Sequence, residues 1–301
     1  MNNIAHQRMT QEALKKKFGS HSVLVGKRTP NYPEQAEREL KRLNNSYMRL
    51  LNKLLKEHLP EIRDAAAREK EHQRHDDTAD LMSTIAKVFD KMADELKEST
   101  DGFGYKDKVE AMAKLTRKLS ISEWKKEVKS TLGIELADDY YTGELFRKLL
   151  NEWIDDNVNL IKTIPNDSLG EMRRLVLEGY RNGKPTTTIV KEIQKVYGQS
   201  RRHAQLIARD QIAKLNSEIT RMQQEDAGVK EYVWSTSGDS RVREGHRRLN
   251  NKRFRWDDPP VVDDKTGRRC HPGEDYQCRC VALAVFDYDT IDLPISGDGG
   301  G

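Results

Sequence analysis

Cysteine and histidine residues near the C-terminal end are the side chains best suited to bind a metal. Cys270 and His271 are adjacent, Cys278 and Cys280 follow shortly after them, and His246 lies upstream. Four thiolate and imidazole groups suit tetrahedral zinc, which could cross-link a segment too polar to hold itself together. The sequence therefore offers His246, His271, Cys278 and Cys280 as candidate zinc ligands.

The same cysteines also suit a core without a metal. The C-x-C spacing of Cys278 and Cys280 differs from the C-x-x-C spacing of common zinc knuckles. On a β-strand, alternation would place both side chains on one face, where thiols pack as small apolar groups. We expect a metal-free cysteine pair ahead of a zinc site, and no other cofactor.

Asp239 and His246 form a second pair that could act together. Asp239 follows a small-residue turn and suits the N-cap of a helix that begins at Ser240. His246 would then lie on the same side of that helix, about two turns further on. Asp239 would cap the helix, orient His246 or join it at a metal, and His246 would be either a ligand or a buried hydrogen-bonding residue.

A basic segment surrounds His246. Residues 241–255 contain one acidic residue, Glu244, and aromatic side chains at Phe254 and, next to the segment, Trp256. The basic residues are Arg241, Arg243, Arg247, Arg248, Lys252, Arg253 and Arg255. Such a set can neutralise phosphates and stack on bases. The alternative is a solvated surface on which the acidic residues that follow form ion pairs; these are Asp257, Asp258, Asp263 and Asp264.

Long helices must position these groups, because most of the preceding chain has helical periodicity. Apolar spacing predicts helices over residues 40–55, 80–97, 109–119, 145–164 and 200–226. We expect Pro60 and Pro165 to interrupt or end helices. Capping boxes at Ser120 and Ser168 would begin new ones, and Gly198 would end another. The helix over 200–226 carries Arg209, which we expect to tether it to the C-terminal unit by ion pairs.

The pattern changes after Gly228. Residues 229–235, which include Trp234, alternate and are rich in β-branched and aromatic side chains, and residues 278–288 do the same, so both predict strands. The region between them is irregular. The predicted fold is therefore mainly α with a small α+β C-terminal unit, a helical N-terminal portion followed by a strand-containing, loop-rich core.

Composition narrows the class of protein. Charged residues make up 34% of the 301 residues, and the net charge of +4 is too mild to identify a nucleic-acid binder. No segment approaches the roughly 18 apolar residues of a membrane helix, and the N-terminal residues lack the apolar region of a secretory signal. The three cysteines, an odd number, do not make a disulfide framework and fit a reducing cytosol. We expect no membrane partner.

An ordered set of motifs extends over roughly residues 155–286. It comprises a long helix with “IARDQ”, a G-V-x-x-x-x-W strand, a D-x-x-V-R-x-x-H turn, a Pro-Pro pair and a final “CRC”. This set resembles the phage Mu F-like head morphogenesis family of minor capsid proteins. Arg209, Trp234, Asp239, His246 and Cys280 occupy its motif positions in this chain.

The resemblance implies a non-enzymatic minor head protein of a tailed bacteriophage. Its location would be the capsid interior near the portal, after assembly in the host cytoplasm. Its partners would be the portal protein, scaffold and major capsid proteins, and phage DNA, with a role in DNA retention or ejection. The alternative is a metal-dependent hydrolase or nuclease, or a toxin-like protein delivered with the DNA.

The resemblance and the periodicity together divide the chain into four parts. We predict a flexible arm over residues 1–30, a helical assembly and docking region over 31–154, a Mu F-like domain over 155–288 and a disordered tail over 289–301. No catalytic residue is assigned. The enzyme alternative would use Asp239, His246, His271, Cys278 and Cys280.

Overall fold

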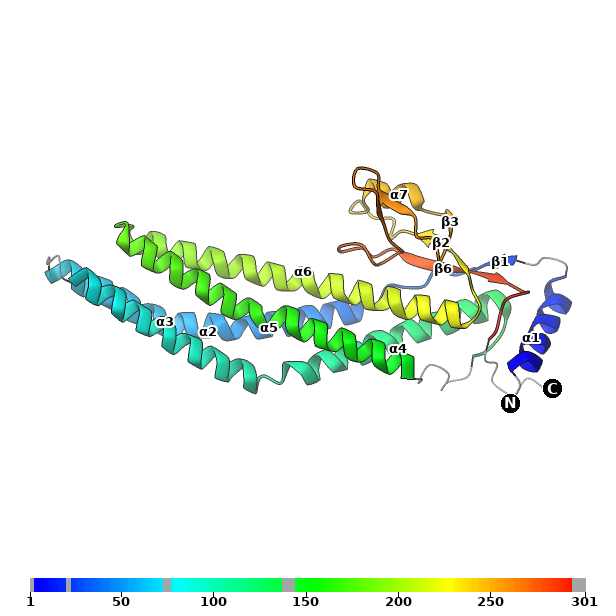
Figure 1. The fold of residues 1–301 in the computed structure, drawn as a ribbon, viewed down its shortest axis with the longest axis horizontal. Coiled ribbons are helices and arrows are strands. Elements are labelled where there is room, and N and C mark those ends of the chain that lie inside the picture. Colours follow the sequence, from blue (N-terminus) through cyan, green and yellow to red (C-terminus); the bar gives the residue numbers. More distant parts are fainter. Residues whose placement is uncertain (1–2, 20–22, 73–76, 137–143, 294–301) are drawn as a thin grey trace. The chain divides into compact units, whose positions relative to one another are not determined.

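The computed structural model describes residues 3–19, 23–72, 77–136 and 144–293 (Figure 1). Its helices are α1 (Asn3–Phe18), α2 (Glu34–His72), α3 (Asp77–Gly102), α4 (Tyr105–Leu132), α5 (Glu144–Arg181), α6 (Thr186–Asp226) and α7 (Glu244–Leu249). Its strands are β1 (Val23–Val25), β2 (Glu231–Ser235), β3 (Arg253–Arg255), β4 (Val261–Asp263), β5 (Arg268–Arg269) and β6 (Val281–Asp287). Long helices followed by short C-terminal strands confirm the predicted fold class.

The chain divides into two compact units, each built from separated parts of the sequence. The strand unit contains residues 1–37, 112–153 and 209–301, and the helical unit contains residues 38–111 and 154–208. The sequence analysis placed the boundary between the helical region and the Mu F-like domain after residue 154. The structure divides the chain differently because α4, α5 and α6 each contribute residues to both units.

The helical unit has an apolar core with a few satisfied polar groups. Asn44, which is fully buried, donates from its side-chain amide to the carbonyl oxygen of Ala204 at 2.8 Å. It also accepts a hydrogen bond from the Tyr105 hydroxyl at 2.7 Å. His58 lies between the carboxylates of Glu61 and Glu95. These contacts link segments far apart in the sequence, so they fix which helix faces pack together.

Several predicted helix breaks are wrong. Pro60 lies inside α2, Pro165 lies inside α5 and Gly198 lies inside α6. Ser168 was expected to begin a helix, but its hydroxyl donates to the Ile164 carbonyl oxygen one turn back at 2.5 Å. A proline costs a helix roughly 3 kcal/mol. The burial of apolar side chains on both sides of each predicted break offsets that cost. Apolar periodicity alone does not reveal the extent of this burial.

The predicted helix start at Ser120 is also wrong, because α4 continues through it. The Ser120 hydroxyl donates to the side-chain oxygen of Asn216 at 2.5 Å, and both residues are buried in the strand unit. Glu123, the partner expected in the capping box, accepts from the Asn31 backbone amide and pairs with Arg28. The two polar side chains therefore make tertiary contacts rather than a helix cap.

The sheet of the strand unit is four-stranded and antiparallel, in the order β1-β6-β2-β3. In its centre Trp234 pairs with Ala282, and Tyr232 pairs with Ala284 and Phe254. The alternation of β2 buries Tyr232 and Trp234 completely, as the sequence predicted for a strand. Strands β4 and β5 form a separate two-stranded sheet.

The predicted flexible arm over residues 1–30 is wrong for its described part. Helix α1 buries Leu14, and the Gln11 side chain donates to the Asp289 carbonyl oxygen. Strand β1 pairs with β6, and the Gly26 amide continues this pairing by donating to Ala284. Both elements depend on partners more than 100 residues away, and such partners leave no local pattern. Residues 1–2 and 20–22 lie outside the described residues.

The structure also differs from the disordered tail predicted over residues 289–301. Ile291 and Leu293 are fully buried, and the Thr290 hydroxyl donates to the Gly228 carbonyl oxygen at 2.8 Å. Residues 289–293 therefore pack against the end of α6, while residues 294–301 lie outside the described residues. Among the described helices, none combines the length and apolar character required to cross a membrane.

Candidate functional site

The site begins with the placement of His246 on the short helix α7. Gly245, the preceding residue, lies so close to β4 that a Cβ atom there would overlap with the Val262 carbonyl oxygen. Helix α7 can therefore dock on β4 only with glycine at this position. The docking buries His246, whose ring meets Trp234 edge-on at a centroid distance of 5.3 Å.

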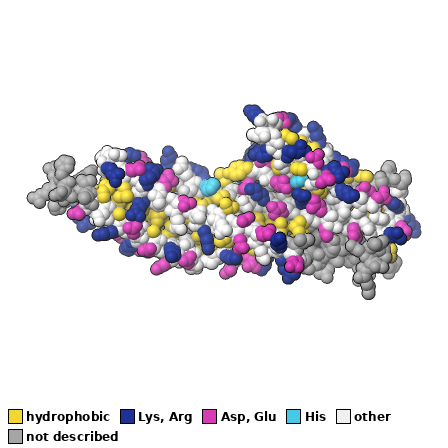
Figure 2. Space-filling model, viewed as in Figure 1, with side chains coloured by type: hydrophobic (Ala, Val, Ile, Leu, Met, Phe, Trp, Pro, Cys, Tyr) yellow, Lys and Arg dark blue, Asp and Glu magenta, His cyan; other side chains and the backbone are white. Residues whose placement is uncertain are grey.

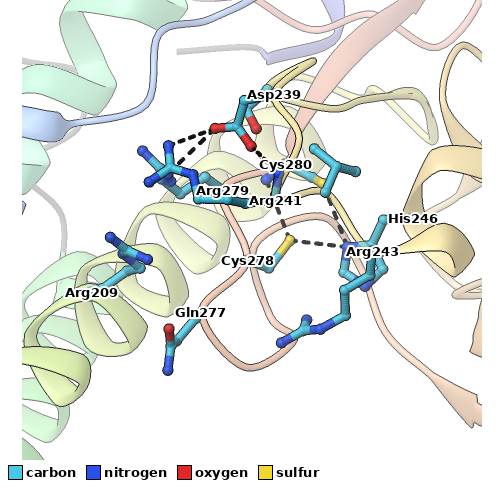
Figure 3. A pocket seen from close by; sticks show the side chains of 11 residues that line it. Arg209, Asp239, Arg241, Arg243, His246, Gln277, Cys278, Arg279 and Cys280 are labelled. Carbon is cyan, nitrogen blue, oxygen red and sulfur yellow. Dashed lines mark hydrogen bonds and ion pairs between the residues drawn. The ribbon is translucent and has the colours of Figure 1, made fainter. Parts of the chain in front are cut away.

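Cys278 and Cys280 meet His246 from the segment that precedes β6. The Nδ1 atom of His246 lies 3.4 Å from the Cys278 sulfur and 3.6 Å from the Cys280 sulfur (Figure 3). All three residues are buried, and their ligand atoms lie within 4.8 Å of one another. The prediction that both cysteines lie on a strand is wrong, because β6 begins at Val281. Both cysteines lie in the irregular segment just before the strand, where the Cys280 amide donates to the Cys278 sulfur.

Asp275 completes this arrangement. Its carboxylate lies 2.9 Å from His246 Nε2 and also pairs with Arg243 at 3.0 Å and Arg268 at 3.3 Å. The carboxylate accepts a hydrogen bond from the Nε2–H group, so in a neutral ring the lone pair lies on Nδ1 and faces the two sulfurs. Sequence reasoning missed Asp275. Its only signal was a carboxylate close to the Cys-Arg-Cys motif, and many acidic residues share that property.

The pKa values of His246, Cys278 and Cys280 all differ from the usual values of these side chains. Burial lowers the pKa of His246, but Cys278 and Asp275 raise it more, and the net shift is upward. A hydrogen bond from Cys280 holds the pKa of Cys278 well below its usual range despite burial, with His246 adding to the effect. The pKa of Cys280 is raised by its hydrogen bond to Cys278 and by burial. The shifts at the two sulfurs have opposite directions, so Cys278 loses its proton more readily than Cys280 does.

A cavity of about 270 Å³ opens beside the three residues. The cavity wall carries Arg209, Arg241, Arg243 and Arg279 together with His246, Cys278 and Cys280. As Figure 3 shows, Arg241 and Arg279 both approach the Asp239 carboxylate, at 2.7 and 3.5 Å. The cavity therefore combines cationic side chains with soft ligand atoms, a setting suited to an anion or a metal-bound solvent molecule.

Asp239 does not occupy the predicted helix N-cap. Helix α7 begins at Glu244, and Asp239 lies in the preceding turn, where its carboxylate accepts from the Arg241 amide at 2.9 Å. The Arg241 guanidinium holds the pKa of Asp239 below its usual range. The carboxylate that orients His246 is therefore Asp275. Arg209 pairs with Glu37 at 3.2 Å within the strand unit, and Asp210 accepts from the Gln277 amide.

His271 and Cys270 lie outside the group formed by His246, Cys278 and Cys280. The Nδ1 atom of His271 is 2.9 Å from the Tyr232 hydroxyl, and its ring packs on Trp256. Cys270 is buried, and burial raises the pKa of its thiol to about 12. Of the residues in the enzyme alternative, the structure thus brings together His246 and the two later cysteines only.

The basic segment forms ion pairs with nearby carboxylates. Six arginines each have an acidic partner: Arg241 with Asp239, Arg243 with Asp275, Arg247 with Glu244, Arg248 with Asp264, Arg253 with Glu231 and Arg255 with Asp257. Asp258 pairs with Arg269, and Asp263 accepts from the Lys265 amide and the Thr266 hydroxyl. On the face shown in Figure 2, basic and acidic side chains are interspersed. The segment is charged and its positive charge is largely compensated.

Residues 171–283 match the family described as Phage Mu protein F like protein, a family of phage head morphogenesis proteins. The match lies within the range of the predicted resemblance and confirms it. It includes His246, Cys278 and Cys280.

One curated relative matches a larger part of the chain. An uncharacterized protein of Haemophilus influenzae is 32% identical over 160 residues, which cover 53% of this chain and 34% of the relative. The chain thus spans about a third of that relative's length. No solved structure matches the chain.

Proposed function

We propose that the chain is a minor head protein of a tailed bacteriophage that associates with the portal. Its roles would be in head assembly and in the retention or ejection of DNA. The observation that supports this proposal is the match of residues 171–283 to a head morphogenesis family. Its partners are the portal protein first, then scaffold and major capsid proteins. Its place in the virion is the capsid interior near the portal, after assembly in the host cytoplasm.

Contacts with DNA in this proposal are made to phosphates rather than to base edges. The basic segment supports them by its density of arginines, which neutralise phosphate without reading sequence. The ion pairs of this segment reduce its expected affinity for DNA, because a phosphate must compete with a carboxylate at each of six arginines. We therefore expect DNA binding to be weak and salt-sensitive, and portal binding to be the stronger interaction.

Co-purification with the portal protein encoded in the same genome tests this proposal. The two proteins are co-expressed and separated by size-exclusion chromatography, and the stoichiometry of the complex is measured by native mass spectrometry. We expect a discrete complex with the portal ring. A chain that elutes alone under all salt conditions would contradict portal association.

A matched pair of charge reversals locates the contact. Arg247 and Arg248 are adjacent, partly exposed and each ion-paired, and Arg173 and Arg174 share these properties on α5. If the basic segment contacts the portal, Arg247→Glu with Arg248→Glu weakens the complex about tenfold or more. The control, Arg173→Glu with Arg174→Glu, leaves it unchanged.

A further inference from the structure

We propose that His246, Cys278 and Cys280 bind one zinc ion, with a fourth ligand supplied by solvent or an anion from the adjoining cavity. The ligand atoms are His246 Nδ1 and the two cysteine sulfurs. The proposal goes beyond the head function and does not depend on it, because it rests on these side chains alone.

The spacing of the ligand atoms fits tetrahedral zinc. Zinc–sulfur bonds of about 2.3 Å and zinc–nitrogen bonds of about 2.0–2.1 Å at a tetrahedral angle separate sulfur from nitrogen by about 3.5 Å. The two sulfurs lie 3.4 and 3.6 Å from the same nitrogen. One zinc ion placed between these atoms would contact the nitrogen and both sulfurs at once.

The surroundings of His246 match those of a metal-binding histidine. Metal-bound histidines usually donate their other ring N–H to a carboxylate, which fixes the tautomer and the ring orientation. Asp275 is that carboxylate, at 2.9 Å from Nε2, and its side chain is 3% exposed. Arg243 and Arg268 pair with the same carboxylate and hold it in place.

The backbone around the cysteines also suits thiolate ligands. The Cys280 amide donates to the Cys278 sulfur at 3.3 Å, a contact that favours the charged form of the sulfur. The metal would join α7 to the segment before β6, which are more than 30 residues apart in the chain. Residues 270–280 contain no helix or strand, so a metal cross-link would stabilise a segment with few backbone hydrogen bonds of its own.

The fourth position faces the cavity. Within the described residues, the histidine, cysteine and acidic side chains close enough to share an ion are these three. All three also line the cavity of about 270 Å³, whose wall carries Arg241, Arg243 and Arg279. A three-ligand zinc with an open position takes water or an anion there, and the arginines favour the anion.

Elemental analysis of the full chain, purified without a metal-affinity tag, tests the proposal. We expect about one zinc per chain in the wild type and in Cys270→Ser, a control that changes a buried cysteine beside the group. Cys278→Ser, Cys280→Ser and His246→Gln should each lose at least about nine-tenths of the zinc. Zinc retained in both Cys278→Ser and Cys280→Ser, or absent from the wild type after dialysis against zinc, would overturn the proposal.

A second measurement uses only the wild-type chain, so it does not depend on the folding of a variant. The chain is stripped with a chelator and titrated with Co²⁺, whose visible absorption is intense in tetrahedral sites and whose near-ultraviolet absorption reports bound thiolates. We expect saturation at about one Co²⁺ per chain, both bands, and displacement by Zn²⁺. Weak visible bands typical of octahedral cobalt, with no thiolate band, would refute the Cys278–Cys280–His246 site.

Discussion

Buried carboxylate side chains connect separate elements of the strand unit. Asp275 connects His246 to Arg243 and Arg268, so one carboxylate positions the ring and compensates two guanidinium groups. Glu127 on α4 is fully buried, and one of its oxygens accepts from the Ala284 amide of β6 at 2.7 Å. Glu127 links α4 to β6, and Asp275 links the segment before β6 to His246 of α7. An apolar side chain could not make these hydrogen bonds.

Glu127 should make stability depend on pH. Burial raises its pKa from 4.5 to about 8, against the opposing effects of the Ala284 amide and Arg28. Between these two values the folded chain therefore carries one more proton than the unfolded chain, so this contribution to stability falls as the pH rises from 4.5 to about 8 and is lost above that. Glu127→Gln should flatten the decline. The free energy of unfolding, measured by urea titration at pH 5 and pH 9, checks it.

Glu123 provides the control for this prediction. Burial alone would raise its pKa, but Lys126, the Asn31 amide and Arg28 together lower the pKa to about 2. Its stabilising contribution is complete above its unfolded pKa and is lost as the pH falls towards 2. Glu123→Gln should therefore change the difference between pH 5 and pH 9 only slightly, because the charge of Glu123 is the smallest cause of the raised pKa of Glu127. An equal change in both variants would contradict the assignment to Glu127.

Docking of short elements onto the sheet region depends on close backbone approach. Helix α7 contacts β4 through Gly245, and Gly26 directly follows β1 at a position where a Cβ atom would crowd the Glu127 carboxylate and the Leu283 side chain. Such elements have little apolar surface of their own. Their positions are fixed by the absence of a side chain at one residue, and His246 depends on this docking.

Gly245→Ala should therefore destabilise the strand unit. The added methyl group meets the Val262 backbone, which cannot rotate away as a side chain could, so we expect a loss of about 1–3 kcal/mol. Gly170→Ala on α5 is the matched control, because nothing lies within 4 Å of its added Cβ atom. That substitution should stabilise by about 0.5–1 kcal/mol through helix propensity. Urea unfolding of both variants measures the difference, and equal effects would contradict the docking argument.

Charge over the whole molecule is nearly balanced. The net charge is +4 in 301 residues, and the arginines of residues 241–255 are paired with carboxylates contributed by β2, α7 and the loops around them. Long-range attraction to DNA is therefore modest, and any binding must come from local exchange of carboxylate for phosphate. This balance favours a protein partner with its own mixed charges.

DNA binding by the proposed basic segment should accordingly be salt-dependent. The logarithm of the association constant for duplex DNA should fall linearly with the logarithm of salt concentration. Arg247→Ala with Arg248→Ala should reduce the slope by about 2, since each lost phosphate contact removes about one. Arg173→Ala with Arg174→Ala should leave it unchanged. Fluorescence anisotropy over a salt series measures the slopes, and identical slopes in all three proteins would exclude the segment from DNA contact.

The local sequence was sufficient to predict the type of most elements but not their ends. The strand at Trp234 and the helical stripes on α2, α3 and α6 follow from periodicity, because burial of one face repeats along the chain. The helix ends predicted at Pro60, Pro165 and Ser120 were wrong. Their effect on a helix is a few kcal/mol, and packing of the flanking turns exceeds it.

By itself the sequence predicted the fold class and the Mu F-like resemblance that residues 171–283 match, and it named Cys278 and Cys280 as candidate partners of His246. Only the tertiary structure decided that Asp275 rather than Asp239 orients His246, that His271 lies elsewhere, and that the N-terminal residues join the sheet. The physical reason is that periodicity and motifs record contacts within a few turns or strands. The position of a side chain in a loop is set by partners that can lie anywhere along the chain.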